Sequence, residues 1–144
     1  MNKVLPDKWI RKAVYDAFNG TVVDTKTINV YDSQYPSISA NNDAYVLMTV
    51  QSNEVIYNKC SNFWLSDILL EVCTLYTSNA NTGSRLLADN ILDALRLEME
   101  TDLDLTGSGL TVDSQLMFFP SDLTTKLTNG SLFRKFIRLE LRIK

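Results

Sequence analysis

The sequence predicts an α+β fold, a mainly antiparallel sheet with two amphipathic helices packed on one face. Three observations predict it: apolar residues recur at helical spacing in two segments, long runs rich in Val, Ile, Leu, Tyr and Thr are typical of strands, and turn residues separate these segments. The 144 residues match the size of one domain, so we expect residues 1–144 to form a single domain.

The first helix is predicted over Asp7–Phe18, because Pro6 precedes this segment and Gly20 follows it. Its apolar residues form two adjoining rows, Trp9, Ala13 and Ala17, and Ile10, Val14 and Phe18. We expect this helix to cover a core, with its charged residues in solvent.

A short strand is predicted over Lys26–Tyr31, followed by a polar loop over 32–43. The segments Ala44–Tyr57 and Phe63–Thr77 predict two long strands paired as a hairpin, with a turn near 59–61 that places Cys73 roughly opposite Met48. Both faces of the second strand are largely apolar, which predicts a strand covered on both sides.

The second helix is predicted from Ser84 to about Glu98, with Leu87, Ile91 and Leu95 in one apolar row. Beyond a loop closed by Gly107 and Gly109, we expect a strand over 110–119 and a loop or short helix over 122–130. A terminal strand over 132–144 completes the prediction. One face of it is apolar, and the other carries Arg134, Arg138, Glu140 and Arg142.

Composition narrows the possible functions. The chain has no His, which removes the usual imidazole base of nucleophilic enzymes, and we expect no cofactor and no bound metal. The formal charge of −3 argues against a coat for nucleic acid, since neutralising phosphates requires an excess of Lys and Arg. We expect a protein without a membrane segment, in which Cys60 and Cys73 are reduced thiols.

Charge is distributed unevenly along the chain. Residues 89–122 carry eight acids against one base, whereas residues 134–144 carry five bases against one acid. Surfaces of opposite charge favour head-to-tail association between copies, although ordinary solvated faces explain the same residues. The interface candidates are Arg134, Arg138 and Arg142, the apolar pair Phe118 and Phe119, and Tyr35 and Pro36 in the long loop. Of the two phenylalanines, we expect at least one in the core.

The most enzyme-like pattern is Glu140-Leu-Arg142, which loosely resembles the Glu-x-Lys ending of metal-dependent nucleases. Arg does not replace that Lys, because a guanidinium does not deprotonate and cannot act as a base. We therefore predict no enzymatic activity. A small metal-dependent carboxylate hydrolase or nuclease is the alternative of a different class.

The order of elements resembles the tail-completion or tail-terminator proteins of double-stranded DNA bacteriophages, which act in head-tail joining. The resemblance lies in an N-terminal amphipathic helix, a Tyr35-Pro36 loop, the hydrophobic strand 69–78, a polar linker and the helix 83–95 with its Ala-Asp-x-Ile-x-x-Ala-Leu pattern. The end of the strand, Leu75-Tyr76-Thr77, departs from the Asp-x-Trp-Ser-like ending of many members.

The resemblance implies a structural virion protein, made in the host cytoplasm and located at the head-tail junction. It implies a homomeric ring, commonly a hexamer, that caps the tail tube and offers the neck or portal a docking surface. DNA would pass through without specific binding, with Asp102, Asp104 and Asp113 as candidates for an acidic lumen. A head-completion or neck adaptor ring that binds the portal is the alternative.

Overall fold

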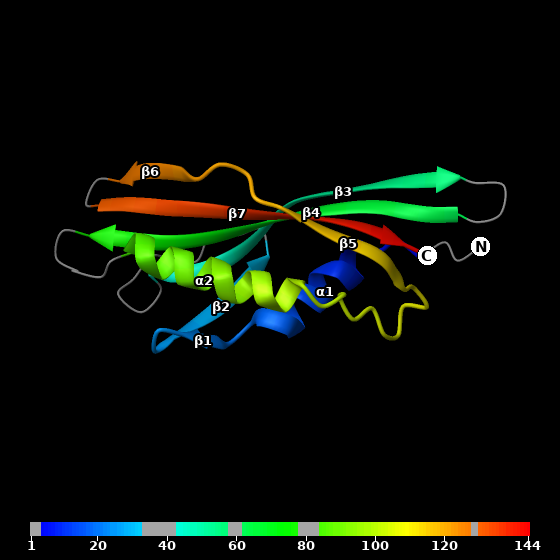
Figure 1. The fold of residues 1–144 in the computed structure, drawn as a ribbon, viewed down its shortest axis with the longest axis horizontal. Coiled ribbons are helices and arrows are strands. Elements are labelled where there is room, and N and C mark those ends of the chain that lie inside the picture. The colour runs from blue at the N-terminus through cyan, green and yellow to red at the C-terminus, as the bar shows by residue number, and fades with distance from the viewer. Residues whose placement is uncertain (1–3, 33–42, 58–61, 78–83, 128–129) are drawn as a thin grey trace.

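The computed structural model describes residues 4–32, 43–57, 62–77, 84–127 and 130–144 (Figure 1). Within these ranges, two helices accompany a seven-stranded sheet with the order β1-β2-β3-β4-β7-β5, in which β6 also pairs with β7. The elements are α1 (Asp7–Phe18), β1 (Thr21–Val23), β2 (Lys26–Asp32), β3 (Ala44–Tyr57), β4 (Asn62–Thr77), α2 (Ser84–Met99), β5 (Val112–Phe118), β6 (Leu123–Leu127) and β7 (Gly130–Ile143). The sheet is mixed, because β2 pairs with β3 in parallel while the other described pairings are antiparallel.

Helix α1 has the predicted bounds, and its core contacts come from Ile10, Ala13, Val14 and Phe18. The row that contains Trp9 and Ala17 was expected to share this burial. Trp9 is only partly buried and Ala17 is exposed, since the helix turns the Ile10 row toward the sheet.

The hairpin β1–β2 includes a strand that the sequence analysis did not predict. Its two-residue connection, Asp24 and Thr25, has positive φ at both positions (48° and 67°). Turns of this type favour Asn-Gly or Asp-Gly, and a Thr in the second position gives no such signal in the sequence.

The predicted hairpin of long strands is confirmed as β3 and β4, but the predicted register is wrong. Cys73 lies opposite Tyr45, and Met48 lies opposite Leu70. Two features account for the shift: the pairing of Tyr57 with Asn62 centres the connection earlier than expected, and a bulge between Met48 and Gln51 adds a residue to β3. Cys60 lies outside the described residues.

Strand β4 is buried on the face toward the helices, whereas the predicted cover of its other face is only partial: Glu71 and Cys73 are buried there, and Leu65 and Leu69 are half-buried. On one face Ile68, Leu70 and Val72 join the main core cluster, to which both helices also contribute side chains. On the other face Cys73 joins a second cluster with Tyr45, Leu47 and Leu132. Figure 1 shows both helices along the same side of the long strands, and we call the opposite side of the sheet the outer face.

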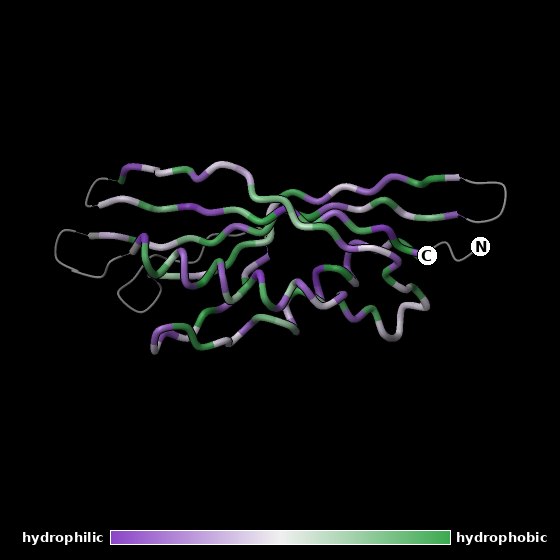
Figure 2. The backbone as a smooth tube through the Cα atoms, in the orientation of Figure 1, coloured by the Kyte–Doolittle hydropathy of each residue, from purple (hydrophilic) through white to green (hydrophobic). Residues whose placement is uncertain are grey.

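Helix α2 ends one residue beyond its predicted limit and buries Leu87, Ala88, Ile91, Leu95 and Met99. Apolar and polar residues alternate along the strands that it covers (Figure 2), which is the pattern of a sheet with one face toward a core. Neither described helix is long and apolar enough to cross a membrane.

The segment predicted as a loop or short helix over 122–130 contains the strand β6, and this prediction is wrong. Strands β5 and β6 pair with successive halves of β7, so together they form one interrupted edge of the sheet. Pro120 lies in the interruption, where it cannot donate a ladder hydrogen bond. The residues of β6 become a strand through their pairing with β7, which a local pattern does not reveal.

We predict that Ile91→Asp strongly destabilises the protein. Ile91 is 0% exposed in the main core cluster, so the substitution buries an unpaired carboxylate at a cost of several kcal/mol, about half of a typical stability. Leu97→Asp on the same helix is the matched control, because Leu97 is 56% exposed. Thermal unfolding followed by circular dichroism should show a large fall in Tm for the first variant and little change for the second. Equal Tm values would contradict the assigned core face of α2.

Candidate interaction surfaces

The three candidate arginines lie on the outer face of β7, opposite the helices. Arg134, Arg138 and Arg142 alternate there with core-facing Ile137, Leu139 and Leu141. This shared face is what their spacing predicts. The three arginines differ, however, in their exposure and in their contacts within the subunit, and therefore in how available they are to a partner.

Arg134 is engaged inside the protein. Its Nε donates a hydrogen bond to Oε1 of Glu71, a carboxylate only 1% exposed, and the Sγ of Cys73 donates to the same oxygen at 3.3 Å. Burial, followed by the charge of Glu71, raises the pKa of the Cys73 thiol, which therefore stays protonated and remains a donor at neutral pH. Buried Glu71 is therefore bound by two donors on the outer face, a pairing that the spacing of residues along the sequence did not reveal.

Arg142 and Lys144 lie at the other end of β7, where both face Asp113. The distances are 3.8 Å from Arg142 Nε and 3.0 Å from Lys144 Nζ to the Asp113 carboxylate. Both cations also lie over the ring of buried Phe63, at 4.1 and 5.3 Å from its centre. Asp113, a candidate for the acidic lumen, is thus paired with two cations.

Arg138 is the most available of the three arginines. Its guanidinium lies 5.1 Å from the ring centre of Phe118, the residue opposite it on β5. Its ion pair with Glu140 is long at 3.9 Å. The side chain is about half exposed. A guanidinium stacked on an aromatic ring keeps its hydrogen-bond donors free for an incoming carboxylate.

Exposed apolar side chains collect beside Arg138. Of the thirteen large apolar side chains exposed in the described parts of the chain, five lie on the interrupted edge 112–127. Leu116, Phe118 and Leu123 pair with Glu140, Arg138 and Arg134, which places them on the outer face. We call the surface formed by Leu116, Phe118, Phe119, Leu123 and Arg138 the edge patch.

The expectation that Phe118 or Phe119 enters the core is wrong. Both are exposed, at 41% and 52%. Phe118 faces outward at the end of β5, Phe119 lies beyond the strand, and Met117 takes the position that faces the core cluster. As interface candidates, the two rings stay a prediction.

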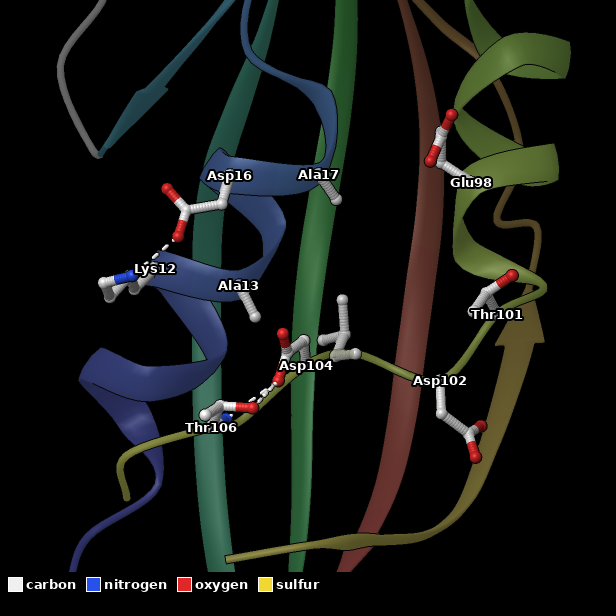
Figure 3. A pocket seen from close by; sticks show the side chains of 10 residues that line it. Lys12, Ala13, Asp16, Ala17, Glu98, Thr101, Asp102, Asp104 and Thr106 are labelled. Atoms are coloured by element: carbon white, nitrogen blue, oxygen red, sulfur yellow. Dashed lines mark hydrogen bonds and ion pairs between the residues drawn. The ribbon is translucent and has the colours of Figure 1, made fainter.

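A cleft of about 520 Å³ opens on the helix side of the sheet, between α1, the end of α2 and the loop that follows it (Figure 3). Ala13 and Ala17 of α1 line it, and its acidic residues are Asp16, Glu98, Asp102 and Asp104. We call it the acidic cleft. Asp102 and Asp104 are thus brought together with Asp16 and Glu98, which the sequence analysis did not select because they belong to different helices.

The charges of the cleft have few internal partners. Lys12 Nζ binds Asp16 at 2.7 Å, and this hydrogen bond raises the pKa of Lys12. Hydrogen bonds from the hydroxyl and amide of Thr106 lower the pKa of Asp104, which keeps it ionised at neutral pH. Among the described residues, neither Glu98 nor Asp102 has a hydrogen bond or ion pair to its carboxylate. Nor do any three His, Cys, Asp or Glu side chains there group closely enough to hold a metal ion.

The loop that carries Asp102 and Asp104 is anchored by Gln115 of β5. Its Nε2 donates to the carbonyl oxygens of Met99 at 2.7 Å and Thr101 at 3.2 Å, and its Oε1 accepts from the amide of Leu103 at 3.1 Å. These bonds fix the acidic residues relative to the edge strand of the same subunit.

Further along, the loop closes against α1 at Gly107, which has a φ of +92°. A Cβ at this position would meet the ring of Trp9 at 3.6 Å. The predicted turn at Gly107–Gly109 is confirmed.

Lys135 fixes the interruption of the edge. Its Nζ lies 2.5 Å from Asp89 of α2 and 3.1 Å from Asp122, which lies between β5 and β6. The hydrogen bond with Asp89 is the main reason that the pKa of Lys135 is raised. Tyr35 and Pro36, the remaining interface candidates, lie outside the described residues.

No model of a known protein family matches the sequence, and no match was found among curated proteins. Among solved structures, the fold is similar to that of a chain in the virion of a native gene transfer agent particle. The two share 14% sequence identity with a TM-score of 0.58, and the match covers 92% of this chain and 94% of the other. At this identity the similarity establishes a shared fold over nearly the whole length of both chains.

We predict that Glu71→Gln lowers the unfolding free energy by about 3 kcal/mol, because it removes the buried charged partner of the Arg134 guanidinium. Urea unfolding should show the loss as a lower midpoint. The double variant Glu71→Leu with Arg134→Met is the control. It removes both charges, and we expect it to recover most of the stability. A single variant that unfolds at the wild-type midpoint would show that the pair contributes nothing.

Proposed function

We propose that this protein is a structural component of a phage-like virion, located at the head-tail junction. There it forms a homomeric ring, with a hexamer favoured, that caps the tail tube and gives the neck a docking surface. The observation that carries the proposal is the fold shared with a virion chain over nearly the whole length of both proteins. The resemblance of the helix and strand order to tail-terminator proteins supports the same role.

The distribution of surface chemistry supports a ring. A ring built from identical subunits uses two different surfaces on each copy, which meet head to tail. The edge patch on the outer face and the acidic cleft on the helix side are two such surfaces, and they differ in charge and in apolar content.

The overall charge supports passage of DNA without binding. At a formal charge of −3 the subunit has no excess of cations, and the described arginines of β7 each have an acidic neighbour. Such a surface provides little of the phosphate neutralisation from which non-specific DNA affinity arises.

We predict that virions produced without this protein accumulate DNA-filled heads and separate tails. Electron microscopy of such preparations should show few joined particles, and addition of the purified wild-type protein should restore joining. Heat-denatured protein is the negative control and should not restore the joining of heads to tails. Normal joining in the absence of the protein would contradict a role at the junction.

Binding to separated heads and tails distinguishes the two ring positions. A tail terminator binds purified tails and is seen as a ring on the head-proximal end of the tube. A neck adaptor binds purified heads at the portal instead. Binding only to heads would reject the tail-cap assignment in favour of the neck alternative.

A further inference from the structure

We propose that the edge patch of one copy docks onto the acidic cleft of a second copy of this chain. Arg138 would meet the acidic rim of the cleft, and Phe118 and its apolar neighbours would cover the cleft floor. This inference rests on the proposed function in that it names the contact from which the ring is built.

The edge patch has the composition of a binding hot spot. Arg138 lies over the ring of Phe118 on it, and Phe119 is exposed at the next position in the chain. Aromatic residues and arginine are enriched where interfaces bind most strongly. Leu116 and Leu123 extend the apolar surface on either side. Contiguous exposed apolar patches mark contact sites, whereas apolar residues scattered singly over a surface do not.

The acidic cleft has the complementary arrangement. Its α1 side presents the small apolar side chains of Ala13 and Ala17, and Leu103 lines it from the loop. Carboxylates surround this apolar surface, whereas the edge patch has an apolar centre with a guanidinium beside it. A volume of about 520 Å³ exceeds that of a single phenylalanine side chain, so the cleft has room for an aromatic ring and for water around it.

The two surfaces of one subunit cannot bind each other. The edge patch lies on the outer face of β5, β6 and β7, while the cleft lies on the helix side of the sheet. Gln115 holds the cleft loop against β5, so both surfaces are fixed on one rigid part of the subunit. Because the two surfaces differ, copies can join head to tail through them, and such a heterologous contact forms a ring where the rotation between copies closes.

The availability of the charged groups favours this pairing over others. Arg134 is bound to Glu71 and is the least exposed of the three, and Arg142 lies with Lys144 beside Asp113. Arg138 has the most exposed side chain, and its nearest carboxylate, that of Glu140, lies 3.9 Å away. On the acidic side, Glu98 and Asp102 have the least engaged carboxylates. The contact gives Asp102 and Asp104 a role between subunits, which differs from the lumen role predicted for them from the sequence.

A charge exchange tests the contact. Sedimentation velocity and mass photometry over a concentration series would measure self-association of the full chain. We expect Arg138→Glu to weaken the association at least tenfold, and the double variant Glu98→Lys with Asp102→Lys to do the same. These positions are on the surface, and circular dichroism should show wild-type Tm values. Asp104 is left unchanged because it orders the loop through Thr106.

The decisive variant combines all three reversals, and it should recover association to within a few-fold of the wild type. Arg85→Glu, which changes an exposed arginine of α2 outside both surfaces, is the matched control and should associate normally. Phe118→Ser should weaken association without any change of charge, and it would test the patch independently if a reversal disturbed folding. Higher salt should weaken the wild-type contact.

Three results would overturn the inference: a wild-type chain that stays monomeric at 100-fold the concentration used in mass photometry, an Arg138→Glu variant that associates normally, or a combined variant that fails to recover. None of these decides the location of the protein, which is tested separately by the joining of heads and tails. A protein that associates through this contact but is not needed for joining would instead reject the proposed function and leave the contact intact.

Discussion

The pairing of β4 with β7 is the constraint on which the rest of the structure depends. It runs from Trp64 opposite Ile143 to Thr77 opposite Gly130 without a shift in register. Because side chains alternate between faces, a slip of one residue would move Leu139 and its neighbours out of the core and bring the arginines in. The positions of the helices, of the Glu71–Arg134 pair and of the edge patch all follow from this one register.

Much of this architecture could be predicted because it is encoded locally. The bounds of α1, α2, β3 and β4 follow from spacing and composition that extend over many residues. The parallel pairing of β2 with β3 and the strand β6 could not be predicted in the same way, since each depends on a partner that is distant in the sequence. The register of the hairpin also depended on a bulge that no residue type marks.

The candidate surfaces likewise have some features that local spacing predicts and others that depend on distant parts of the chain. Period-two spacing placed the three arginines on one face, but it could not distinguish Arg134, whose carboxylate partner is buried, from Arg138, which stands over Phe118. Asp102 and Asp104 were selected because they lie in a segment of the sequence that is rich in acidic residues. Their companions Asp16 and Glu98 come from different helices, and only the packing of those helices around the loop brings the four together.

The interrupted edge limits how a partner can bind. An unbroken edge strand offers a row of backbone groups to which any extended chain can add. Here Pro120 breaks the ladder between β5 and β6, and Asp113 and Lys126 place charges near the two ends. Backbone pairing along the full edge is thereby disfavoured, while the apolar side chains on the outer face stay exposed. In the contact proposed above, recognition at this edge therefore depends on side chains, and the partner matches Arg138 and its apolar neighbours rather than extending the sheet.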